Sequence, residues 1–387
     1  MSGEDNTNRK KRNFIRPVIL LVVIAVIAII VISLISAYNA GNLHPSRLFS
    51  RGLTEITVDE FNFDVGRERM FAHADGFTAA AGTLGINVFD SSGNETLRDA
   101  FRMSRPTLGH SGNRFIAYDI GGSSVRVFNS TQIISELEIE GVIVSASLNQ
   151  NGWFTIVTHE GGNNRGIVTT YNNHGTAVHW VSFGTGFVLS AELSHDNQNL
   201  AILNLAETGS RINFYHGIDT DKHEPDFIFD IYGGLIIDIV YLPNNEVLAI
   251  SMDSLFLVEN DGRGRMVHSF ADKHLNGYAY AGDFIALHLN DYGVGNQGRL
   301  MTFLADGTNL GELILNREIL SMSAADRTLV ILKSDGALFF DEELEAFSVS
   351  ADSFSAAGAS RILAVSEDVA IATSENSAVV VRREKEH

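Results

Sequence analysis

The chain has no cysteine, only five prolines and only two tryptophans among its 387 residues. The lack of cysteine excludes disulfides, thiolate metal sites, thiol nucleophiles and a lipidated N-terminal cysteine. Charged residues make up only 19% of the chain and hydrophobic residues 45%, so the chain can bury a large core and is not globally disordered. An exported domain without cysteine is ordinary in a low-cysteine bacterium, and the composition therefore favours a bacterial origin.

Glycine and phenylalanine are abundant, with 35 and 24 copies. Glycine supplies the positive φ angles of tight turns, and phenylalanine fits the half-buried surface of a pleated sheet. This combination predicts an all-β protein built from many short strands.

A long apolar run stands near the N-terminus. Val18 to Tyr38 contains 21 residues without a charge, enough for a helix spanning roughly 30 Å of hydrocarbon. Five basic residues precede it and predict a cytoplasmic N-terminus with the remainder outside. We therefore expect a single-pass protein of the cytoplasmic membrane. Its expected parts are a cytoplasmic basic tail over 1–16, a transmembrane helix over 17–38, a linker over 39–52 and an extracytoplasmic domain over 53–384.

An apolar run of this kind has two alternatives to an anchor. A cleavable signal peptide has a shorter apolar region of about 7 to 15 residues, and Ile35 to Ala37 is at best a tolerable cleavage site. A buried core helix would have a polar face, which this run lacks. The sequence thus favours an uncleaved signal-anchor.

Charge is distributed unevenly along the chain. Taking the five basic and two acidic residues of positions 1–38 from the totals of 28 and 47 leaves residues 39–387 with a formal charge near −22. Such a field repels nucleic acid and anionic lipid headgroups, and it also serves simply to keep a large domain soluble. No nucleic-acid partner is expected.

A short apolar strand recurs eight times, at intervals of 37 to 47 residues. Spacing of this order is typical of a four-stranded propeller blade. The repeats begin at Phe77, Phe115, Trp153, Leu200, Val247, Phe284, Leu329 and Val369.

The flanking residues extend this pattern to whole blades. Several repeats are followed by a strand that ends in an Asp, Asn and Gly turn, as at Val88-Phe-Asp-Ser-Ser-Gly, and then by a more polar fourth strand, as at Thr176 to Phe183. We expect a β-propeller of eight four-stranded blades, with seven as the alternative. The last blade runs out of chain, and the segment Leu53-Thr-Glu-Ile-Thr-Val could supply its outer strand and close the ring.

The repeat lacks the Gly-His and Trp-Asp pairs of WD40 blades, and its Val88-Phe-Asp-Ser-Ser-Gly form is similar to that of quinoprotein-type propellers. With its basic N-terminus, single span and absence of cysteine, the whole chain resembles a family of membrane-anchored β-propeller proteins of Gram-positive bacteria. No activity is established for that family, so the resemblance implies a fold of the quinoprotein-like and WD40-like superfamily but no chemistry.

The densest group of potential metal ligands contains Asp219, Asp221 and Glu224. Alternating carboxylates in a loop can bind Ca²⁺ through oxygen, but the spacing does not match the calcium-binding loop of EF-hands, and a solvated acidic connection is the alternative. No other cofactor is expected. Gly293 to Gly298 matches G-x-G-x-x-G, but it is expected to join two strands rather than to open a helix, which argues against dinucleotide binding.

No catalytic constellation is recognisable. No two histidines stand at the spacing of H-E-x-x-H, although a propeller could bring together histidines from different blades. The four considered are His110, His174, His195 and His268.

The sequence therefore predicts a platform rather than an enzyme. We expect the propeller to bind a protein or a cell-wall polymer through loops on one face of the ring, in a role such as envelope assembly. The alternatives are a glycan-acting enzyme whose carboxylates converge in the central channel, and a ligand-sensing module that would need a partner to pass on its signal.

Overall fold

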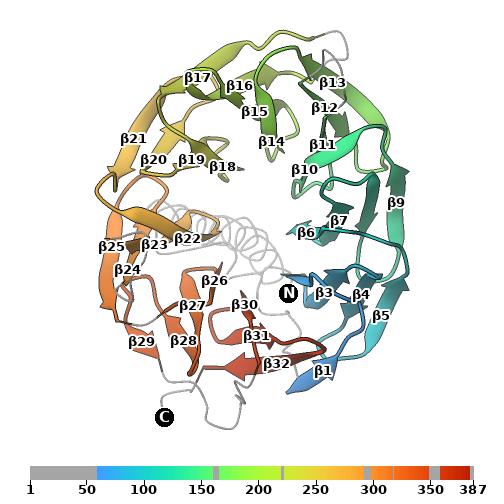
Figure 1. Ribbon diagram of the computed structural model, residues 1–387, viewed down its shortest axis with the longest axis vertical. Helices are drawn as coiled ribbons and strands as arrows, with labels where there is room; N and C mark the ends of the chain where they lie inside the picture. The colour runs from blue at the N-terminus through green and yellow to red at the C-terminus, as the bar shows by residue number, and fades with distance from the viewer. Residues whose placement is uncertain are drawn as a thin grey trace, which may run out of the picture. The chain divides into compact units, whose positions relative to one another are not determined.

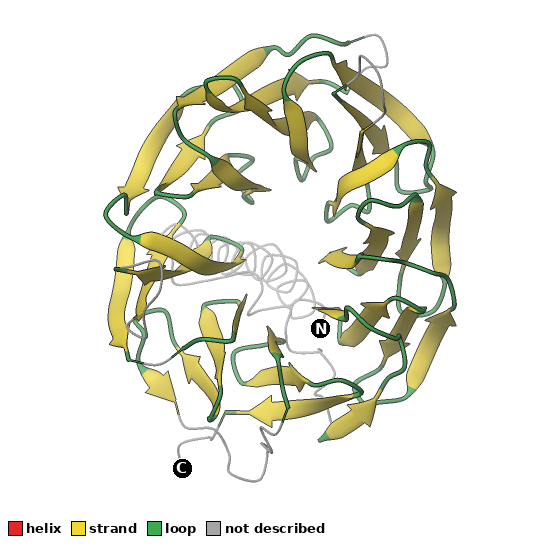
Figure 2. Cartoon of the chain, in the orientation of Figure 1, coloured by secondary structure: helices red, strands yellow, loops and turns green. Residues whose placement is uncertain are grey.

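The computed structural model describes residues 59–159, 165–218, 222–291, 298–316, 318–347 and 358–383. All of them belong to the second of two compact units, Glu55–His387. The expected tail, transmembrane helix and linker lie outside the described residues. Within the described ranges the chain contains only strands and loops, and no helix there has the length and apolarity to cross a bilayer (Figure 2).

The strands form eight antiparallel sheets of four strands each, arranged as the blades of a ring (Figure 1). In seven blades the four strands follow one another along the chain, and in the eighth the outermost strand comes from the beginning of the described chain. The predicted propeller and its eight blades are confirmed. Blades are numbered from the one that contains β2.

The second strand of every blade is the recurring apolar segment predicted from the sequence. These strands are buried on both sides because each sheet is sandwiched between two neighbouring blades, so their residues do not alternate between apolar and polar. They are β3 (Phe77–Gly82), β7 (Arg114–Asp119), β11 (Phe154–His159), β15 (Asn199–Ala206), β19 (Val247–Ser251), β23 (Phe284–Asn290), β27 (Thr328–Lys333) and β31 (Val369–Thr373).

The innermost strands border the centre of the ring. Those of blades 3 to 6 each carry an irregularity in their pairing with the second strand, which bends the strand and redirects its side chains. The innermost strands are β2 (Met70–Ala74), β6 (Pro106–Ser111), β10 (Val142–Leu148), β14 (Phe187–Leu193), β18 (Ile236–Tyr241), β22 (His274–Ala281), β26 (Ser321–Ala325) and β30 (Arg361–Ala364).

The third strands are also largely buried, whereas the outermost strands are the most polar and form the rim. The third strands are β4 (Gly85–Phe89), β8 (Ser124–Phe128), β12 (Gly166–Tyr171), β16 (Gly209–His216), β20 (Ser254–Val258), β24 (Gly298–Leu304), β28 (Gly336–Phe340) and β32 (Ser377–Arg382). The outermost strands are β5 (Glu95–Asp99), β9 (Ile133–Glu138), β13 (Ala177–Phe183), β17 (Phe227–Tyr232), β21 (Gly264–Ser269), β25 (Asn309–Leu315), β29 (Ala346–Phe347) and β1 (Glu60–Asn62).

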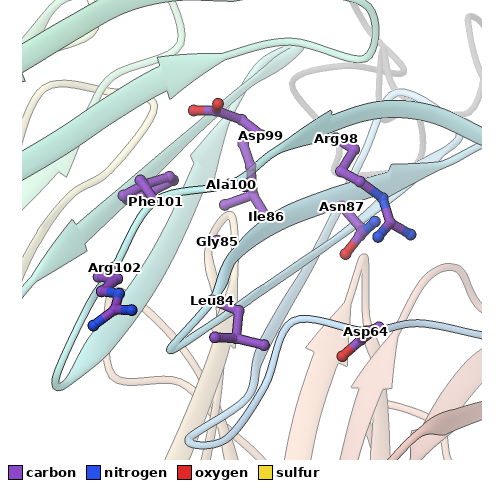
Figure 3. A pocket seen from close by; sticks show the side chains of 10 residues that line it. All are labelled: Asp64, Leu84, Gly85, Ile86, Asn87, Arg98, Asp99, Ala100, Phe101 and Arg102. Carbon is purple, nitrogen blue, oxygen red and sulfur yellow. The ribbon is translucent and has the colours of Figure 1, made fainter.

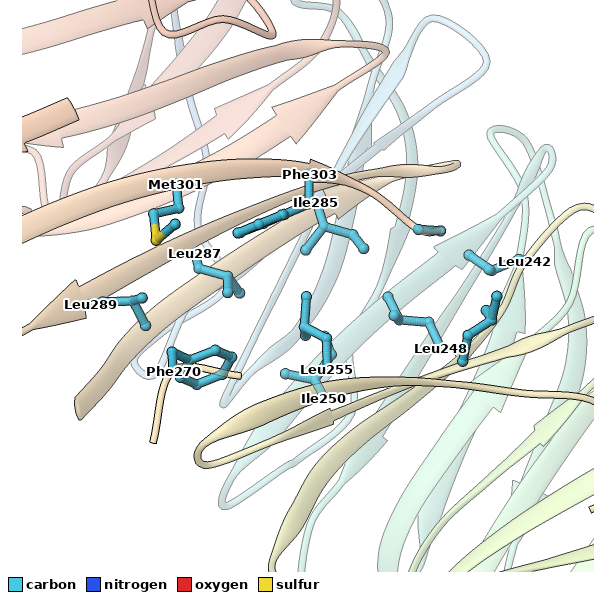
Figure 4. Close-up of a cluster of buried hydrophobic side chains, with 12 residues drawn as sticks. Leu242, Leu248, Ile250, Leu255, Phe270, Ile285, Leu287, Leu289, Met301 and Phe303 are labelled. Atoms are coloured by element: carbon cyan, nitrogen blue, oxygen red, sulfur yellow. The ribbon is translucent and has the colours of Figure 1, made fainter. Parts of the chain in front are cut away.

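The core is divided into clusters that lie between neighbouring blades. In the cluster between blades 5 and 6, Ile250 and Leu255 of one sheet pack against Leu287 and Phe303 of the next (Figure 4). Each buried aliphatic side chain stabilises the fold by about 1.5 to 3 kcal/mol, so the ring is held together by the same contacts that shield its sheets.

The ring is closed by a strand other than the one expected. β1 pairs with β32, so an N-terminal strand does complete the last blade, but that strand is Glu60–Asn62, whereas Leu53 to Val58 lies outside the described residues. The choice follows from side chains. Phe61 and Phe63 are only 7% and 5% exposed and pack against Phe89 and Phe71 of blade 1.

Replacing Phe61 with alanine removes a ring from the interface between blades 8 and 1. Truncation of a buried phenylalanine costs about 3 to 5 kcal/mol, so we expect the free energy of unfolding of F61A to fall by about 3 kcal/mol in urea denaturation of the full chain. Glu60 is exposed on the same strand, and E60A should change stability by less than about 0.5 kcal/mol. Equal losses in the two variants would mean that this packing does not close the ring.

Candidate functional site

The direction of the strands distinguishes two faces of the ring. In each blade, the turns after the first and third strands lie on one face, and the turns after the second and fourth strands lie on the other. Asp59, just before β1, forms an ion pair of 2.6 Å with Arg382 at the end of β32. The described chain therefore begins and ends on the face of the first and third turns, which we call the proximal face. The opposite one is the distal face.

Exposed apolar side chains gather on the distal face. They lie at the distal ends of strands, in turns between second and third strands or in links between blades; Tyr232, at the distal end of β17, is 77% exposed. At the proximal ends of strands, the described residues expose fewer: Phe227 and Ile228 at the start of β17 and Tyr280 near the end of β22. The distal set is Leu84, Val142, Phe187, Tyr232, Leu235, Met252 and Leu320.

The proximal face is built from acidic turns. Asp306 shows the pattern: its Oδ1 accepts the Thr308 N–H at 2.8 Å, and this hydrogen bond lowers the pKa of Asp306. Asp90 and Asp341 accept backbone N–H groups in the same way in the third turns of their blades. This confirms the predicted Asp and Asn turns and makes the proximal face negatively charged.

A second group of polar residues lies on the innermost strands of blades 4 to 6. Tyr278 Oη of β22 donates a hydrogen bond to Asp238 Oδ2 of β18 at 2.9 Å, and the Ile239 N–H donates to Asp238 Oδ1 at 2.9 Å. Burial raises the pKa of Asp238 to about 6 although both hydrogen bonds oppose the shift.

Glu192 of β14 is the neighbour of Asp238 across the blade boundary. Burial raises the pKa of Glu192 well above its usual value, repulsion by the Asp238 carboxylate adds to the shift, and a hydrogen bond with Ser147 opposes it. Buried carboxyl groups with raised pKa values, close enough for one to act on the other, are the groups from which general acids and bases are drawn.

The structure also contains a pocket of about 380 Å³ on the distal side of blade 1 (Figure 3). It opens between β4, β5 and the links that lead into and out of the blade. Its lining combines apolar and charged groups: Asp64, Leu84, Gly85, Ile86, Asn87, Arg98, Asp99, Ala100, Phe101 and Arg102.

The predicted metal ligands are only partly described. Asp219 and Asp221 lie outside the described residues, and Glu224 lies in the proximal loop between β16 and β17. In that loop Asp226 forms an ion pair of 2.6 Å with Lys222. Among the described residues no three His, Asp or Glu side chains converge into a metal site. Calcium binding therefore stays a prediction.

The four histidines considered are not brought together. His110 lies on β6, His174 in the turn after β12, His195 in the turn after β14 and His268 on β21, each in a different blade. The link containing Gly293 lies outside the described residues, but it stands between β23 and β24 of one blade, as expected, so the next described element is a strand.

Sequence reasoning missed Glu192, Asp238 and Arg102. The signal for the two acids was present: each stands inside an otherwise apolar innermost strand, where a carboxylate is costly to bury. Nothing in the linear sequence brings them together, because they belong to different blades. Arg102 lies in the link after β5, and nothing in the sequence around it indicates a binding residue.

The closed ring of eight meandering sheets defines the protein as a β-propeller. The chain belongs to a family of unknown function (DUF5711), whose sequence pattern matches residues 74–343, from the end of β2 to the turn before β29. The curated proteins compared with this chain include no match.

Solved structures of similar fold cover most of the chain. The C-terminal WD40 domain of Sif2 is 14% identical, with 86% of this chain and 99% of that chain covered and a TM-score of 0.58. Sqt1 of Saccharomyces cerevisiae is 11% identical, with 84% and 98% covered and a TM-score of 0.57. BamB from Moraxella catarrhalis is 13% identical, with 85% and 99% covered and a TM-score of 0.52. Identities this low show a shared fold alone.

Asp238 predicts a specific pH dependence of stability. Because folding raises its pKa from 3.8 to about 6, the folded state holds the proton more tightly, and the free energy of unfolding falls as pH rises from about 4 to 6. A shift of two units corresponds to at most about 3 kcal/mol. D238N should therefore gain up to about 3 kcal/mol relative to wild type between pH 4 and 7.5, measured by urea denaturation.

The control for this measurement is D306N. The pKa of Asp306 is lowered by folding, so its stabilising contribution is present at neutral pH and is lost as pH falls. D306N should thus lose stability relative to wild type as pH rises from about 2.5 to 5, the opposite sign to that expected for D238N as pH rises. A shift of the same sign in both variants would contradict the assignment.

Proposed function

We propose that this protein is a single-span, extracytoplasmic β-propeller that is tethered to the cytoplasmic membrane and binds a protein partner on its distal face, in assembly of the cell envelope. The single observation that carries this proposal is the gathering of exposed apolar side chains on the distal face, opposite the face where the described chain begins.

The chemistry of the two faces supports the choice between them. The carboxylates of the proximal turns are already engaged by the backbone of their own hairpins. The distal face carries most of the exposed apolar side chains instead, and such a surface suits a protein partner.

The chemistry of the distal face suits a protein surface. Phe187, Tyr232 and Met252 are of the residue types enriched where proteins bind each other, and the Arg165 guanidinium lies 5.7 Å from the centre of the Phe187 ring. A rigid ring presents such residues without an entropic cost of ordering, which favours binding.

The orientation in the membrane is tested with single cysteines, since the chain has none of its own. We expect a cysteine at position 232 to react with a membrane-impermeant maleimide in intact cells and a cysteine at position 5 to react only after lysis. Labelling of position 5 in intact cells would reverse the proposed orientation, and labelling of neither would place both sites inside.

The binding face is tested by photocrosslinking in native membranes. A photoreactive residue at the distal position 232 should capture a defined protein reproducibly, whereas the same group at the proximal turn position 261 should not. Capture only from position 261 would move the interface to the proximal face. Capture of wall glycan alone from position 232 would replace the protein partner by a wall polymer.

The proximity of Glu192 and Asp238 favours one second candidate, a glycan-acting enzyme with its site at the centre of the ring. Glycoside cleavage uses two carboxyl groups that flank the scissile bond, one of them with a raised pKa. Purified full-length protein would then release oligosaccharides from cell-wall glycan, and both E192Q and D238N would abolish this release. Equal release by wild type and the two variants would exclude the pair as its source.

A further inference from the structure

The blade 1 pocket combines free binding groups with walls that are already fixed. Gly85 makes the close approach of its two strands possible: its φ is +135°, and a Cβ there would lie 2.1 Å from the Asp99 carbonyl oxygen. Only glycine fits this position without moving β5. The pocket therefore depends on one residue that brings β4 and the end of β5 together.

One wall of the pocket contains Asp99 and Phe101, and the buried Arg126 behind it compensates its charge. Arg126 is 5% exposed and donates to Asp99 at 3.2 Å and to Glu136 at 2.6 Å. Its guanidinium lies 4.5 Å from the centre of the Phe101 ring. These contacts fix Asp99 and Phe101 in place, and a ligand does not have to order them.

The opposite wall contains Asn87 and Arg98, whose side chains also form contacts within the blade. Arg98 forms an ion pair of 2.6 Å with Glu95, which also accepts a hydrogen bond from the Asn87 side-chain amide at 2.6 Å. Asp64 adds a further negative charge near Arg98. The charges of this wall thus compensate one another.

Two groups at the mouth remain available. Arg102 is exposed, and within the described part of the chain it makes no ion pair or hydrogen bond. Leu84 is 54% exposed on the other side of the opening (Figure 3). The exposed Arg67 stands next to it, with its backbone N–H 2.9 Å from Thr83 Oγ1. The mouth therefore offers an apolar contact together with unpaired positive charge.

This positive charge stands out against the net charge of the chain. Residues 39–387 carry a formal charge near −22, and acidic turns cover the opposite, proximal face. An acidic segment is repelled by most of this surface, so an unpaired arginine beside an apolar pocket selects for it strongly. The volume of about 380 Å³ is at the small end for binding pockets and suits one side chain rather than a whole domain.

We propose that the blade 1 pocket is the docking site for an extended acidic segment of the partner, which inserts one aliphatic side chain between Leu84 and Phe101 and places a neighbouring carboxylate on Arg102. This inference rests on the proposed function, because it identifies where and how the distal face holds its protein partner.

The test measures binding of fluorescent, end-blocked peptides to the full-length protein in nanodiscs of neutral lipid. The probes are an acidic peptide with one leucine, Asp-Leu-Glu-Glu, its amide analogue, Asn-Leu-Gln-Gln, and the acidic peptide without the leucine, Asp-Gly-Glu-Glu. We expect the first to bind at least about tenfold more tightly than either analogue, since a charge-assisted hydrogen bond and an apolar contact are lost in turn.

Variants assign the binding to this pocket. R102Q should weaken the first peptide about tenfold, R102K should restore most of the affinity, and R263Q on the proximal face should have no effect. A leucine-independent affinity, equal binding of the amide analogue, or an unchanged affinity in R102Q would each overturn the proposal. Thermal melts of R102Q and R102K confirm that both variants fold.

The two proposals fail separately. If position 232 captures a protein in membranes and R102Q leaves that capture unchanged, the distal platform stands and the pocket proposal is wrong. If the acidic peptide binds with the expected dependence on Arg102 but no protein is captured from the distal face, the pocket stands and the proposed platform in the membrane is wrong.

Discussion

Burial of both faces of every sheet is the constraint on which this structure depends. A four-stranded sheet of mainly apolar residues is stable only when another layer covers each face, and here each blade covers its two neighbours. Leu287 and Phe303 of blade 6, for example, complete the core that Ile250 and Leu255 of blade 5 begin. A closed ring satisfies this requirement for every blade at once. It is closed at the junction where β1 pairs with β32, and there Phe61 and Phe63 pack between blade 8 and blade 1.

Folding explains the surface composition of the two faces of the ring to different degrees. The third turns use Asp306 and its counterparts because a carboxylate that accepts backbone N–H groups holds a tight hairpin. The negative charge of the proximal face is thus explained by the carboxylates that its hairpins require. On the distal face, neither the core nor the hairpins account for the exposure of Phe187 and Tyr232. The distal face is therefore where surface composition says most about function.

Periodicity made most of the fold predictable from the sequence. Phe284 and its seven counterparts marked the second strand of each blade, and the polar turns placed the third and fourth strands, because strands buried on both sides and tight turns leave local patterns. The closing strand was expected at Leu53 to Val58, which is rich in strand-forming residues, whereas Glu60 to Asn62 is short and is recognised through the contacts of Phe61 with blade 1. The Glu192 and Asp238 pair and the Arg102 pocket were not predictable, since each joins residues through the geometry of the ring. Asp219 and Asp221, which the sequence did single out, lie outside the described residues.

Glu192 and Asp238 stand out because the ring does not need them. Burial raises the pKa of both carboxyl groups, which means that folding acts against their charged forms, and Tyr278 offsets only part of this cost. An apolar side chain would pack at either position without that penalty, as Val240 does on the same innermost strand. A residue that lowers stability and adds nothing to closure or packing is a candidate for a functional position. The centre of the ring is thus the second region, besides the distal face, that holds such candidates.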